Sequence, residues 1–252
     1  EHMQSEGLSP NTVTFICTLK ACATLGAIDK GMQIHDEILS RGLLQKDVLL
    51  GTALVDMYAK CGALAKAHEV LDELPGRDVV SWNALITGYV EDGLYQESLK
   101  CLIYMQLEGV YPNTVTFLCC LKACHSVNDI SKVLQMHTDI AKEGFENNSF
   151  LGSTLVDLYF KSGLLHEAKE VFDELAIRDA ISWNILIGGY VQYGLADEAL
   201  DCFSKMQQEG IPPDGVTFTC ILKACSSISA LDKGEEIHAE IDRKGLLEKN
   251  IV

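Results

Sequence analysis

Ten cysteines give this 252-residue chain its widest chemical range, because thiols bind metals, form disulfides and act as nucleophiles. No two of them form the Cys-x-x-Cys spacing of a zinc site or a redox pair. Eight instead recur 101 or 102 residues apart, as Cys22, Cys124 and Cys225, as Cys101 and Cys202, and as Cys17, Cys119 and Cys220. Cysteines fixed by a repeat on packed helices behave as small buried hydrophobes. The pattern predicts reduced thiols in a reducing compartment and no metal site.

Other catalytic machinery is also missing from the sequence, which contains no nucleophile–base constellation and no glycine-rich loop for phosphates. The chain is 48% hydrophobic, enough for a substantial core, and no Pro/Gly/Ser-rich linker divides it. No apolar run approaches the roughly 18 residues that indicate a membrane span. We therefore expect a binding module without a cofactor and without a membrane partner.

The charge of −16 argues against a nucleic-acid ligand, since phosphate binding normally needs a basic surface. Acidic residues could also simply coat the outer helices and keep the protein soluble. The lysines, however, recur in register on the first helices of predicted helix pairs, where they would form a stripe if those helices line one surface. They are Lys20, Lys122 and Lys223 in one register, and Lys60 and Lys161 in another.

A long-range repeat sets these registers. The segment Arg77–Asn83 (RDVVSWN) returns 101 residues later as Arg178–Asn184 (RDAISWN). Shorter units lie inside it, in which an apolar opening is followed by a residue that tolerates the left-handed conformation, and then by a second apolar segment at helical spacing. These punctuating residues are Gly26, Gly62, Gly93, Asn128, Gly163, Gly194 and Ser229. Helix pairs of this kind cannot bury their apolar faces alone, so the pattern predicts an all-α solenoid of stacked modules.

Seven modules follow from the repeat, at 12–47, 48–78, 79–113, 114–148, 149–179, 180–214 and 215–250. Residues 1–11 match the end of a module, and residues 251–252 match the start of another. We therefore expect the chain to be part of a longer array.

Three module types resemble those of the pentatricopeptide repeat (PPR) proteins, in the plant subclass that alternates standard, long and short repeats. The segment Val79–Ile86 is similar to the standard type, Phe15–Cys22 to the long type and Thr52–Gly62 to the short type. The resemblance implies a right-handed superhelix in which modules 12–47, 114–148 and 215–250 are long, 48–78 and 149–179 are short, and 79–113 and 180–214 are standard. The tetratricopeptide repeat is a weaker match, because its period is fixed and Leu-Gly-x-x-Tyr follows its tryptophan, unlike the residues after Trp82.

The resemblance implies binding of single-stranded RNA at about one base per repeat. In this family the fifth residue of the first helix and the last residue of the module contact the base edge. Those pairs are Thr52/Asp78, Asn83/Asn113, Ser153/Asp179, Asn184/Asp214 and Thr219/Asn250. Apolar second residues sandwich the bases, here Val13, Leu49, Val80, Val115, Phe150, Ile181 and Val216. The lysine stripe would contact phosphates.

By the family's code, Thr52/Asp78 and Ser153/Asp179 resemble guanine readers. Asn184/Asp214 resembles a uracil reader, Asn83/Asn113 a pyrimidine reader that favours cytosine, and Thr219/Asn250 suggests adenine. The alkyl fifth residues Ile16 and Leu118 cannot hydrogen-bond a base, so their long modules are expected to act as spacers or to bind protein. The expected ligand is 5′-N-G-(C/U)-N-G-U-(A?)-3′, read from the N-terminal module onward.

The polar readers also have a purely structural interpretation. Asp47, Asp78, Asp179 and Asp214 directly precede first helices, where a carboxylate caps the exposed amides. The residues alone favour capping, and with the resemblance we expect both roles together. Trp82 and Trp183 repeat in a register that suits core packing better than base stacking.

Proteins of this subclass often carry a C-terminal cytidine-deaminase-like domain that edits C to U in organelle transcripts. Such chemistry needs His-x-Glu and Pro-Cys-x-x-Cys. The segment His238–Glu240 matches the first half, but His35 and His137 occupy the same register, so the histidine belongs to the repeat. The resemblance implies the targeting part of an editing factor in a chloroplast or mitochondrion, with any deaminase outside this chain.

An interaction scaffold is the alternative function, favoured by the negative charge and by the alkyl residues Ile16 and Leu118. In the family, editing-factor partner proteins are thought to dock on long-type repeats, so RNA and protein binding are compatible.

Overall fold

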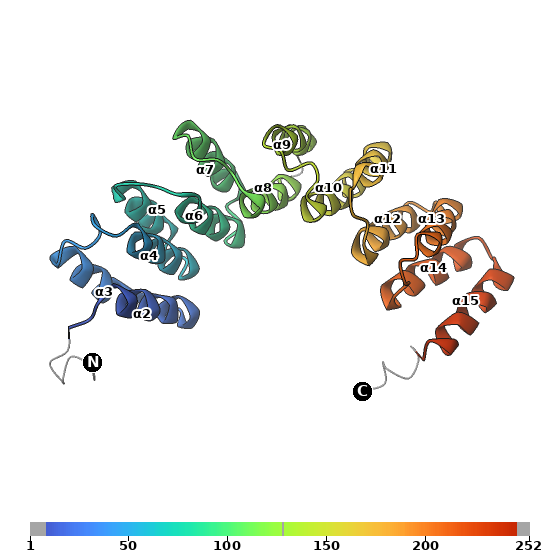
Figure 1. Ribbon diagram of the computed structural model, residues 1–252, viewed down its shortest axis with the longest axis horizontal. Coiled ribbons are helices and arrows are strands. Elements are labelled where there is room, and N and C mark those ends of the chain that lie inside the picture. Colours follow the sequence, from blue (N-terminus) through green and yellow to red (C-terminus); the bar gives the residue numbers. More distant parts are fainter. Residues whose placement is uncertain (1–8, 128, 246–252) are drawn as a thin grey trace. The chain divides into compact units, whose positions relative to one another are not determined.

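The computed structural model describes residues 9–127 and 129–245, and the regular structure of these residues is entirely α-helical. The chain forms two compact units, Glu1–Met136 and His137–Val252. Each unit is a stack of helix pairs, as the sequence predicts (Figure 1).

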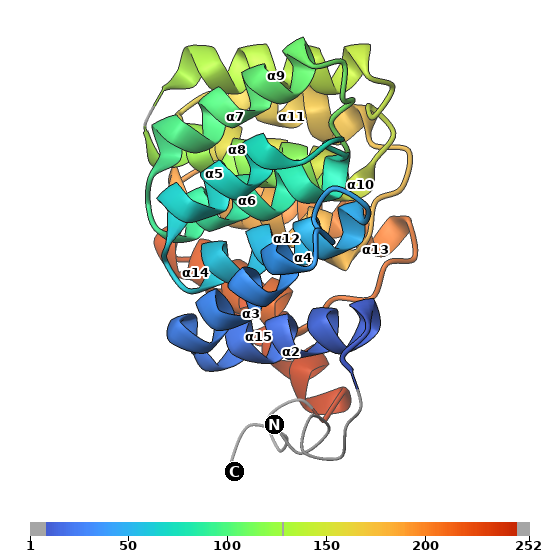
Figure 2. The ribbon, with the colours of Figure 1, turned by 90° about the vertical axis from the view of Figure 1, so that its left-hand side faces the viewer.

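Unit 1 alternates first and second helices along the chain. Its first helices are α2 (Thr12–Leu25), α4 (Val48–Lys60), α6 (Val79–Glu91) and α8 (Thr114–Ser126). Its second helices are α3 (Ile28–Ser40), α5 (Leu64–Glu73) and α7 (Tyr95–Leu107), while α9 (Ile130–Lys142) runs across the boundary of the two units. The first helices α2, α4 and α6 each pack on their own second helix and on the first helix of the next module, and Figure 2 shows this stacking for α2 to α7.

Unit 2 repeats the arrangement. Its first helices are α10 (Ser149–Lys161), α12 (Ala180–Gln192) and α14 (Gly215–Ser227), and its second helices are α11 (Leu165–Glu174), α13 (Ala196–Gln208) and α15 (Leu231–Arg243). Close backbone contacts join α10 to α12 and α12 to α14. Within each unit the first helices therefore form one continuous layer. The assignment of modules to long, short and standard types stays a prediction.

Every first helix begins with a side-chain cap. Asp47 Oδ1, for example, accepts a hydrogen bond from Leu49 N at 3.0 Å. Four caps form a reciprocal capping box with the third residue of the helix, the pairs being Asp78/Ser81, Asn113/Thr116, Asp179/Ser182 and Asp214/Thr217. The capping interpretation is confirmed, and each cap stabilises its helix by about 1 kcal/mol.

Left-handed residues separate the two helices of a pair. Gly26 adopts φ of 64°, and Ser229 adopts 56° as the single non-glycine residue with positive φ in the described part of the chain. A side chain in this conformation is strained, which is why glycine stands at most of the equivalent positions. Asn128, predicted to serve the same purpose, lies outside the described residues.

The repeated tryptophans are core residues, as predicted. Trp82 and Trp183 are each 2% exposed, and the Trp183 ring meets the Phe172 ring edge-on with centroids 4.7 Å apart. Truncation of such a residue to alanine typically costs about 3–5 kcal/mol.

Two glycines allow the first helices to approach each other closely. A Cβ atom on Gly88 would lie 2.7 Å from Ala59 Cβ on the preceding first helix, and one on Gly189 would lie 2.5 Å from the Phe160 ring. Both distances are far inside van der Waals contact, so these positions exclude any side chain. Glycine recurs at this position of the repeat because adjacent first helices leave no room for a side chain there.

Histidines on second helices hydrogen-bond tyrosines on the next first helix. His35 Nδ1 lies 2.9 Å from Tyr58 Oη, and His137 Nδ1 lies 2.7 Å from Tyr159 Oη. Burial lowers the pKa of both histidines. By contrast, His238 in the same register is mostly exposed and lies 3.4 Å from Asp242 Oδ2.

The cysteines are all free thiols, but the prediction of burial is wrong for one set. Cys22, Cys124 and Cys225 are buried, as are Cys101 and Cys202, and burial raises the pKa of Cys101 to about 12. Cys17 is exposed, and Cys119 and Cys220 are half-buried. These are sixth residues of first helices, about 100° around the helix from the fifth, and they still lie beside the face turned away from the core.

Neither a membrane span nor a metal cluster is found in the described residues. No helix there has the length and apolarity to cross a bilayer. No three His, Cys, Asp or Glu side chains within residues 9–127 and 129–245 could share a metal ion.

Candidate functional site

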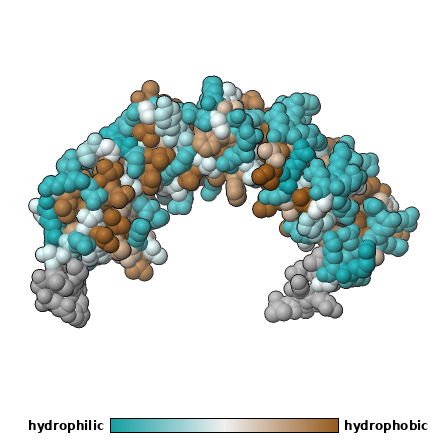
Figure 3. All heavy atoms as spheres, in the orientation of Figure 1, coloured by the Kyte–Doolittle hydropathy of each residue, from teal (hydrophilic) through white to brown (hydrophobic). Residues whose placement is uncertain are grey.

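The second residue of every first helix is an exposed apolar side chain. Between 50% and 71% of each residue's surface is exposed, at Val13, Leu49, Val80, Val115, Phe150, Ile181 and Val216. Figure 3 shows hydrophobic side chains emerging among hydrophilic ones on the surface of unit 1. Regularly spaced apolar groups in water are costly unless they serve binding, so this row marks one face of the first-helix layer as a candidate site.

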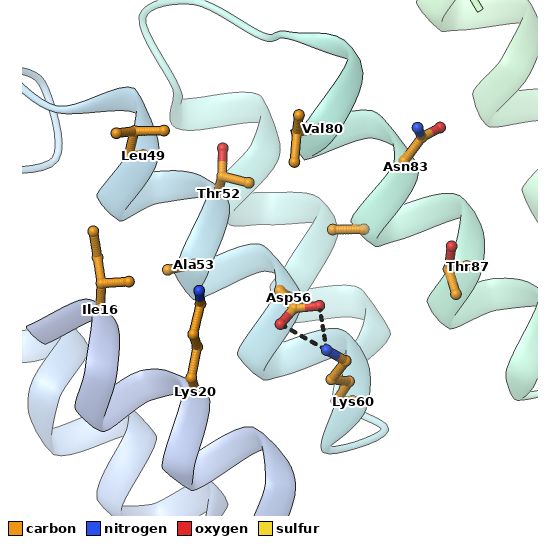
Figure 4. A pocket seen from close by; sticks show the side chains of 11 residues that line it. Ile16, Lys20, Leu49, Thr52, Ala53, Asp56, Lys60, Val80, Asn83 and Thr87 are labelled. Atoms are coloured by element: carbon orange, nitrogen blue, oxygen red, sulfur yellow. Dashed lines mark hydrogen bonds and ion pairs between the residues drawn. The ribbon is translucent and has the colours of Figure 1, made fainter. Parts of the chain in front are cut away.

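A pocket of about 520 Å³ opens on this face in unit 1, between α2, α4 and α6. Leu49 and Val80 stand on either side of Thr52, whose hydroxyl points between them (Figure 4). Thr52 Oγ1 is buried and has no hydrogen-bond partner. A buried polar atom without a partner is destabilising and calls for an explanation. The donor and acceptor of this hydroxyl are both unused within the described residues.

An equivalent pocket of about 360 Å³ lies in unit 2. Its walls include Phe150 and Ile181, and its polar lining includes Ser153, Asp157 and Asp179. These five residues stand 101 positions after Leu49, Val80, Thr52, Asp56 and Asp78. The structure thus brings the predicted pair Ser153 and Asp179 together within one pocket.

The predicted pairs of the standard modules are in direct contact. Asn83 Nδ2 donates to Asn113 Oδ1 at 3.0 Å. Asn184 Nδ2 lies 3.0 Å and 3.1 Å from the two carboxylate oxygens of Asp214. The fifth and last residues therefore form single polar units, although they are separated by 30 positions in the sequence.

A third residue contacts each of these two polar pairs, and sequence reasoning missed it. The Thr116 hydroxyl lies 2.6 Å from Asn83 Oδ1, and the Thr217 hydroxyl lies 2.6 Å from Asn184 Oδ1. Both threonines are third residues of the following first helix. Nothing in the local sequence signals the contact, because it depends on how two modules stack.

Hydrogen bonding holds Asp214 in its charged form. Burial alone would raise its pKa, but hydrogen bonds led by those from the Thr217 backbone N–H and the Asn184 amide lower it below the ordinary value of 3.8. Asp214 is thus a carboxylate at neutral pH and can only accept hydrogen bonds.

Two of the predicted phosphate-contacting lysines form ion pairs. Lys60 Nζ lies 2.9 Å from Asp56, and Lys161 Nζ lies 2.6 Å from Asp157. The i, i+4 spacing of each pair is the sequence signal for such an ion pair on a helix. The other three lysines, Lys20, Lys122 and Lys223, are exposed and take part in no ion pair recorded within residues 9–127 and 129–245. Phosphate contact by all five stays a prediction.

The long modules differ from the others at the fifth position. Ile16 lines the unit 1 pocket with its alkyl group, and Leu118 is half-buried. Thr219 is exposed and its hydroxyl donates to Gly215 O at 2.7 Å. Its predicted partner Asn250 lies outside the described residues.

Helix-pair repeats, in which each first helix carries an exposed apolar side chain at its second position, define an α-helical repeat protein. Two models of known repeats match the sequence. The PPR repeat family matches residues 77–126 and 178–227, and the PPR repeat matches residues 52–79 and 153–178. Together the matches span 52–126 and 153–227, more than half of the chain. The chain belongs to the PPR repeat family.

Curated relatives of the chain come from Arabidopsis thaliana. A putative pentatricopeptide repeat-containing protein is 40% identical over 91% of this chain and 34% of its own length. Another, named chloroplastic, is 37% identical over 93% of this chain and 32% of its own length. A third, named mitochondrial, is 33% identical over 96% of this chain and 38% of its own length. The chain therefore spans about a third of the length of these relatives.

Solved structures show the same fold. The pentatricopeptide repeat protein PPR10 from maize matches with a TM-score of 0.65 at 20% identity, covering 97% of this chain and 41% of the maize chain. The structure of PPR10 in complex with an 18-nt psaJ RNA element matches with a TM-score of 0.64 at 18% identity, covering 94% and 35%.

Proposed function

We propose that this chain binds single-stranded RNA along its first-helix layer, with about one base per module. The observation that carries the proposal is the pocket around Thr52, where a buried hydroxyl without a partner faces the space between two exposed apolar side chains. A base has an apolar face for such walls and a polar edge for such a hydroxyl. PPR10, a protein of the same family and fold, is known in complex with an RNA element.

Stacking supplies the sequence-independent part of binding. Each base would lie between the second residues of successive modules, for example between Leu49 and Val80 or between Phe150 and Ile181. Base stacking contributes about 1–3 kcal/mol per base on aromatic side chains. We expect the aliphatic walls to give less than the Phe150 wall, because they lack a π-face.

The hydrogen-bond inventory of the standard modules distinguishes two pyrimidines. Asn113 Oδ1 already accepts from Thr116 N at 3.1 Å and from Asn83, so its amide N–H groups are what remains for a ligand. Together with the second N–H of Asn83 they offer donors only, which suits the neighbouring acceptors O2 and N3 of cytosine. Asp214 offers only acceptors, which suits the N3–H of uracil, while the second N–H of Asn184 suits a uracil carbonyl.

Guanine is the base that fits the short modules. Its edge presents two adjacent donors, N1–H and N2–H, and a carboxylate accepts from both. Asp78 and Asp179 would supply that carboxylate, and Thr52 and Ser153 a neutral hydroxyl. Ser153 and Asp179 line the same pocket. The proposed ligand is 5′-N-G-(C/U)-N-G-U-(A?)-3′, with cytosine favoured in the third place.

The alternation of module types places the chain, in our proposal, in the plant subclass that targets C-to-U editing in organelles. Relatives named chloroplastic and mitochondrial support an organellar location. In this proposal the chain is the RNA-targeting part, and any deaminase activity resides in a domain outside it.

Selection from a random RNA pool tests the base assignments. The expected result is enrichment of G at the second and fifth places and of U at the sixth. Binding with enrichment of other bases at those places would contradict the assignments while preserving RNA binding itself. Absence of any enriched RNA would remove the proposed function.

A protein-interaction scaffold is the second candidate. The charge of −16 and the alkyl fifth residues Ile16 and Leu118 favour it, and editing-factor partner proteins would then dock on the long modules. Titration of RNA at two salt concentrations separates the two functions. A scaffold would show neither salt-dependent RNA binding nor a change of base preference when Asn83 is replaced by Thr.

A further inference from the structure

A hydroxyl from the next module orients the reading amide in each standard module. Thr116 Oγ1 accepts a hydrogen bond from Asn113 N at 3.1 Å and lies 2.6 Å from Asn83 Oδ1. In unit 2, Thr217 Oγ1 accepts from Asp214 N at 3.1 Å and lies 2.6 Å from Asn184 Oδ1. The same geometry thus occurs twice, 101 residues apart, in two separate units.

Proton accounting shows what this hydroxyl does. A threonine hydroxyl has one proton, and Asn83 Oδ1 at 2.6 Å is a closer acceptor for the Thr116 proton than Asn113 Oδ1 at 3.2 Å. The Asn83 amide oxygen therefore faces Thr116, and its nitrogen faces Asn113 Oδ1 at 3.0 Å. An amide has nearly the same shape after a 180° rotation, so packing alone does not choose between the two orientations. The Asn113 oxygen and the Thr116 hydroxyl together hold one orientation, and they leave an N–H donor for the base.

The short modules provide an internal comparison. Ser81 and Ser182 are third residues too, but their hydroxyls donate to the backbone oxygens of Asp78 and Asp179 at 2.9 Å. Thr52 Oγ1 has no partner at all, so Ser81 does not touch it. A capping-box hydroxyl is thus present after the short modules and after the standard modules. Among the described residues, the contact to the preceding fifth residue is seen where threonine follows a module with asparagine there, at Thr116 and Thr217.

The third residue changes in step with the preceding fifth residue along the chain. Alkyl fifth residues are followed by leucine, hydroxyl residues by serine and asparagine by threonine. The pairs are Ile16/Leu50, Thr52/Ser81, Asn83/Thr116, Leu118/Leu151, Ser153/Ser182 and Asn184/Thr217.

We propose that Thr116 and Thr217 are positioning residues for base recognition, which hold the amide orientation of Asn83 and Asn184 and thereby sharpen the base preference of each standard module. This inference rests on the proposed RNA-binding function. The third residue of a module then belongs to the specificity of the module before it.

Titration of the 252-residue chain with four single-stranded RNAs that differ only at the third place tests the proposal. Thr116→Val removes the hydroxyl and keeps the shape, so the preference for C over U should fall about three- to tenfold, the equivalent of one net hydrogen bond. Thr116→Ser should restore it. The matched control Ser81→Ala removes an equivalent capping hydroxyl that touches no fifth residue, and should leave the preference at the third place unchanged.

A second measurement reports the orientation without RNA. The side-chain amide protons of Asn83 should exchange slowly in the unchanged chain and in Thr116→Ser, and at least several-fold faster in Thr116→Val. Thermal unfolding of Thr116→Val and Ser81→Ala should show similar loss of stability, because both lose one cap contact.

Each result of these measurements either supports or overturns the proposal. Loss of C-over-U preference in Thr116→Val with rescue by Thr116→Ser supports the proposal. Equal preference in all variants, or a uniform loss of affinity for all four RNAs, overturns it and leaves Thr116 a helix cap. If the unchanged chain binds no RNA, the proposed function fails, and unaltered amide exchange in Thr116→Val would separately overturn the orienting role.

Discussion

We predict that the ion pair between Lys60 and Asp56 influences how strongly salt affects the proposed RNA binding. The two groups are 2.9 Å apart on α4, with side-chain exposures of 52% and 30%, and Lys60 lines the candidate pocket. An exposed pair of this kind contributes only about 0–1 kcal/mol to stability, so the ammonium group is weakly held. Asp56→Asn would remove the competing carboxylate, preserve the side-chain shape and release Lys60 to a phosphate.

The expected magnitude follows from counterion release. For single strands the logarithm of the binding constant falls with the logarithm of salt by about 0.7 for each neutralised phosphate. Asp56→Asn should therefore steepen the slope by up to about 0.7. Between 50 and 200 mM salt this gives a further loss of affinity of about 2.6-fold. The equivalent change Asp157→Asn releases Lys161, and the two should add to about sevenfold.

Fluorescence anisotropy with a labelled RNA at three salt concentrations measures the slope. Asp56→Asn should strengthen RNA binding at low salt. Lys60→Ala should weaken it, because it leaves the Asp56 carboxylate facing the strand. Asp201→Asn is the matched control, since Asp201 pairs with Lys205 at 2.7 Å with the same spacing on the second helix α13. If Asp56→Asn and Asp201→Asn change the slope equally, the effect is one of net charge and the reasoning fails.

Three further predictions concern base choice, packing and pH. Asn184→Thr creates the short-module pair in a standard module, and should shift the sixth place from U to G in RNA titrations. Gly189→Ala should destabilise the fold by about 1–3 kcal/mol through overpacking, whereas Gly188→Ala, with its nearest neighbour atom 3.8 Å away, should stabilise it by up to about 1 kcal/mol; denaturant unfolding compares them. Burial lowers the pKa of His137 from its ordinary 6.5, so the unfolded chain binds the proton more readily than the folded one. The free energy of unfolding should therefore fall as pH drops below about 6.5. This fall should be smaller in His137→Gln, as denaturant unfolding at several pH values would show.

Much of the fold was predictable because it depends on local signals. The polar residue before each first helix, such as Asp47, predicted a cap, and the left-handed turn at Gly26 followed from its residue type. The burial of Trp82 followed from its register in the repeat. Internal repetition made each of these inferences stronger, since one pattern had to suit several modules.

The parts that sequence reasoning missed depend on contacts between modules. The Thr116 hydroxyl reaches Asn83 only because α8 packs beside α6. Exposure of Cys17 depends on where the apolar face of its helix ends, which residue type does not reveal. The i, i+4 spacing predicts the pairing of Lys60 with Asp56, whereas the recurrence of lysines in register reports only their positive charge.

The close approach of first helices at Gly88 and Gly189 has a consequence for the geometry of a bound strand. Packed helix axes lie about 8–10 Å apart, whereas consecutive bases in a helical strand rise only about 3.4 Å. A polynucleotide that places one base in each slot must therefore be extended well beyond its stacked rise. A strand extended in this way cannot fold back into a hairpin, so the same spacing that admits a base would also hold the surrounding transcript open to other molecules.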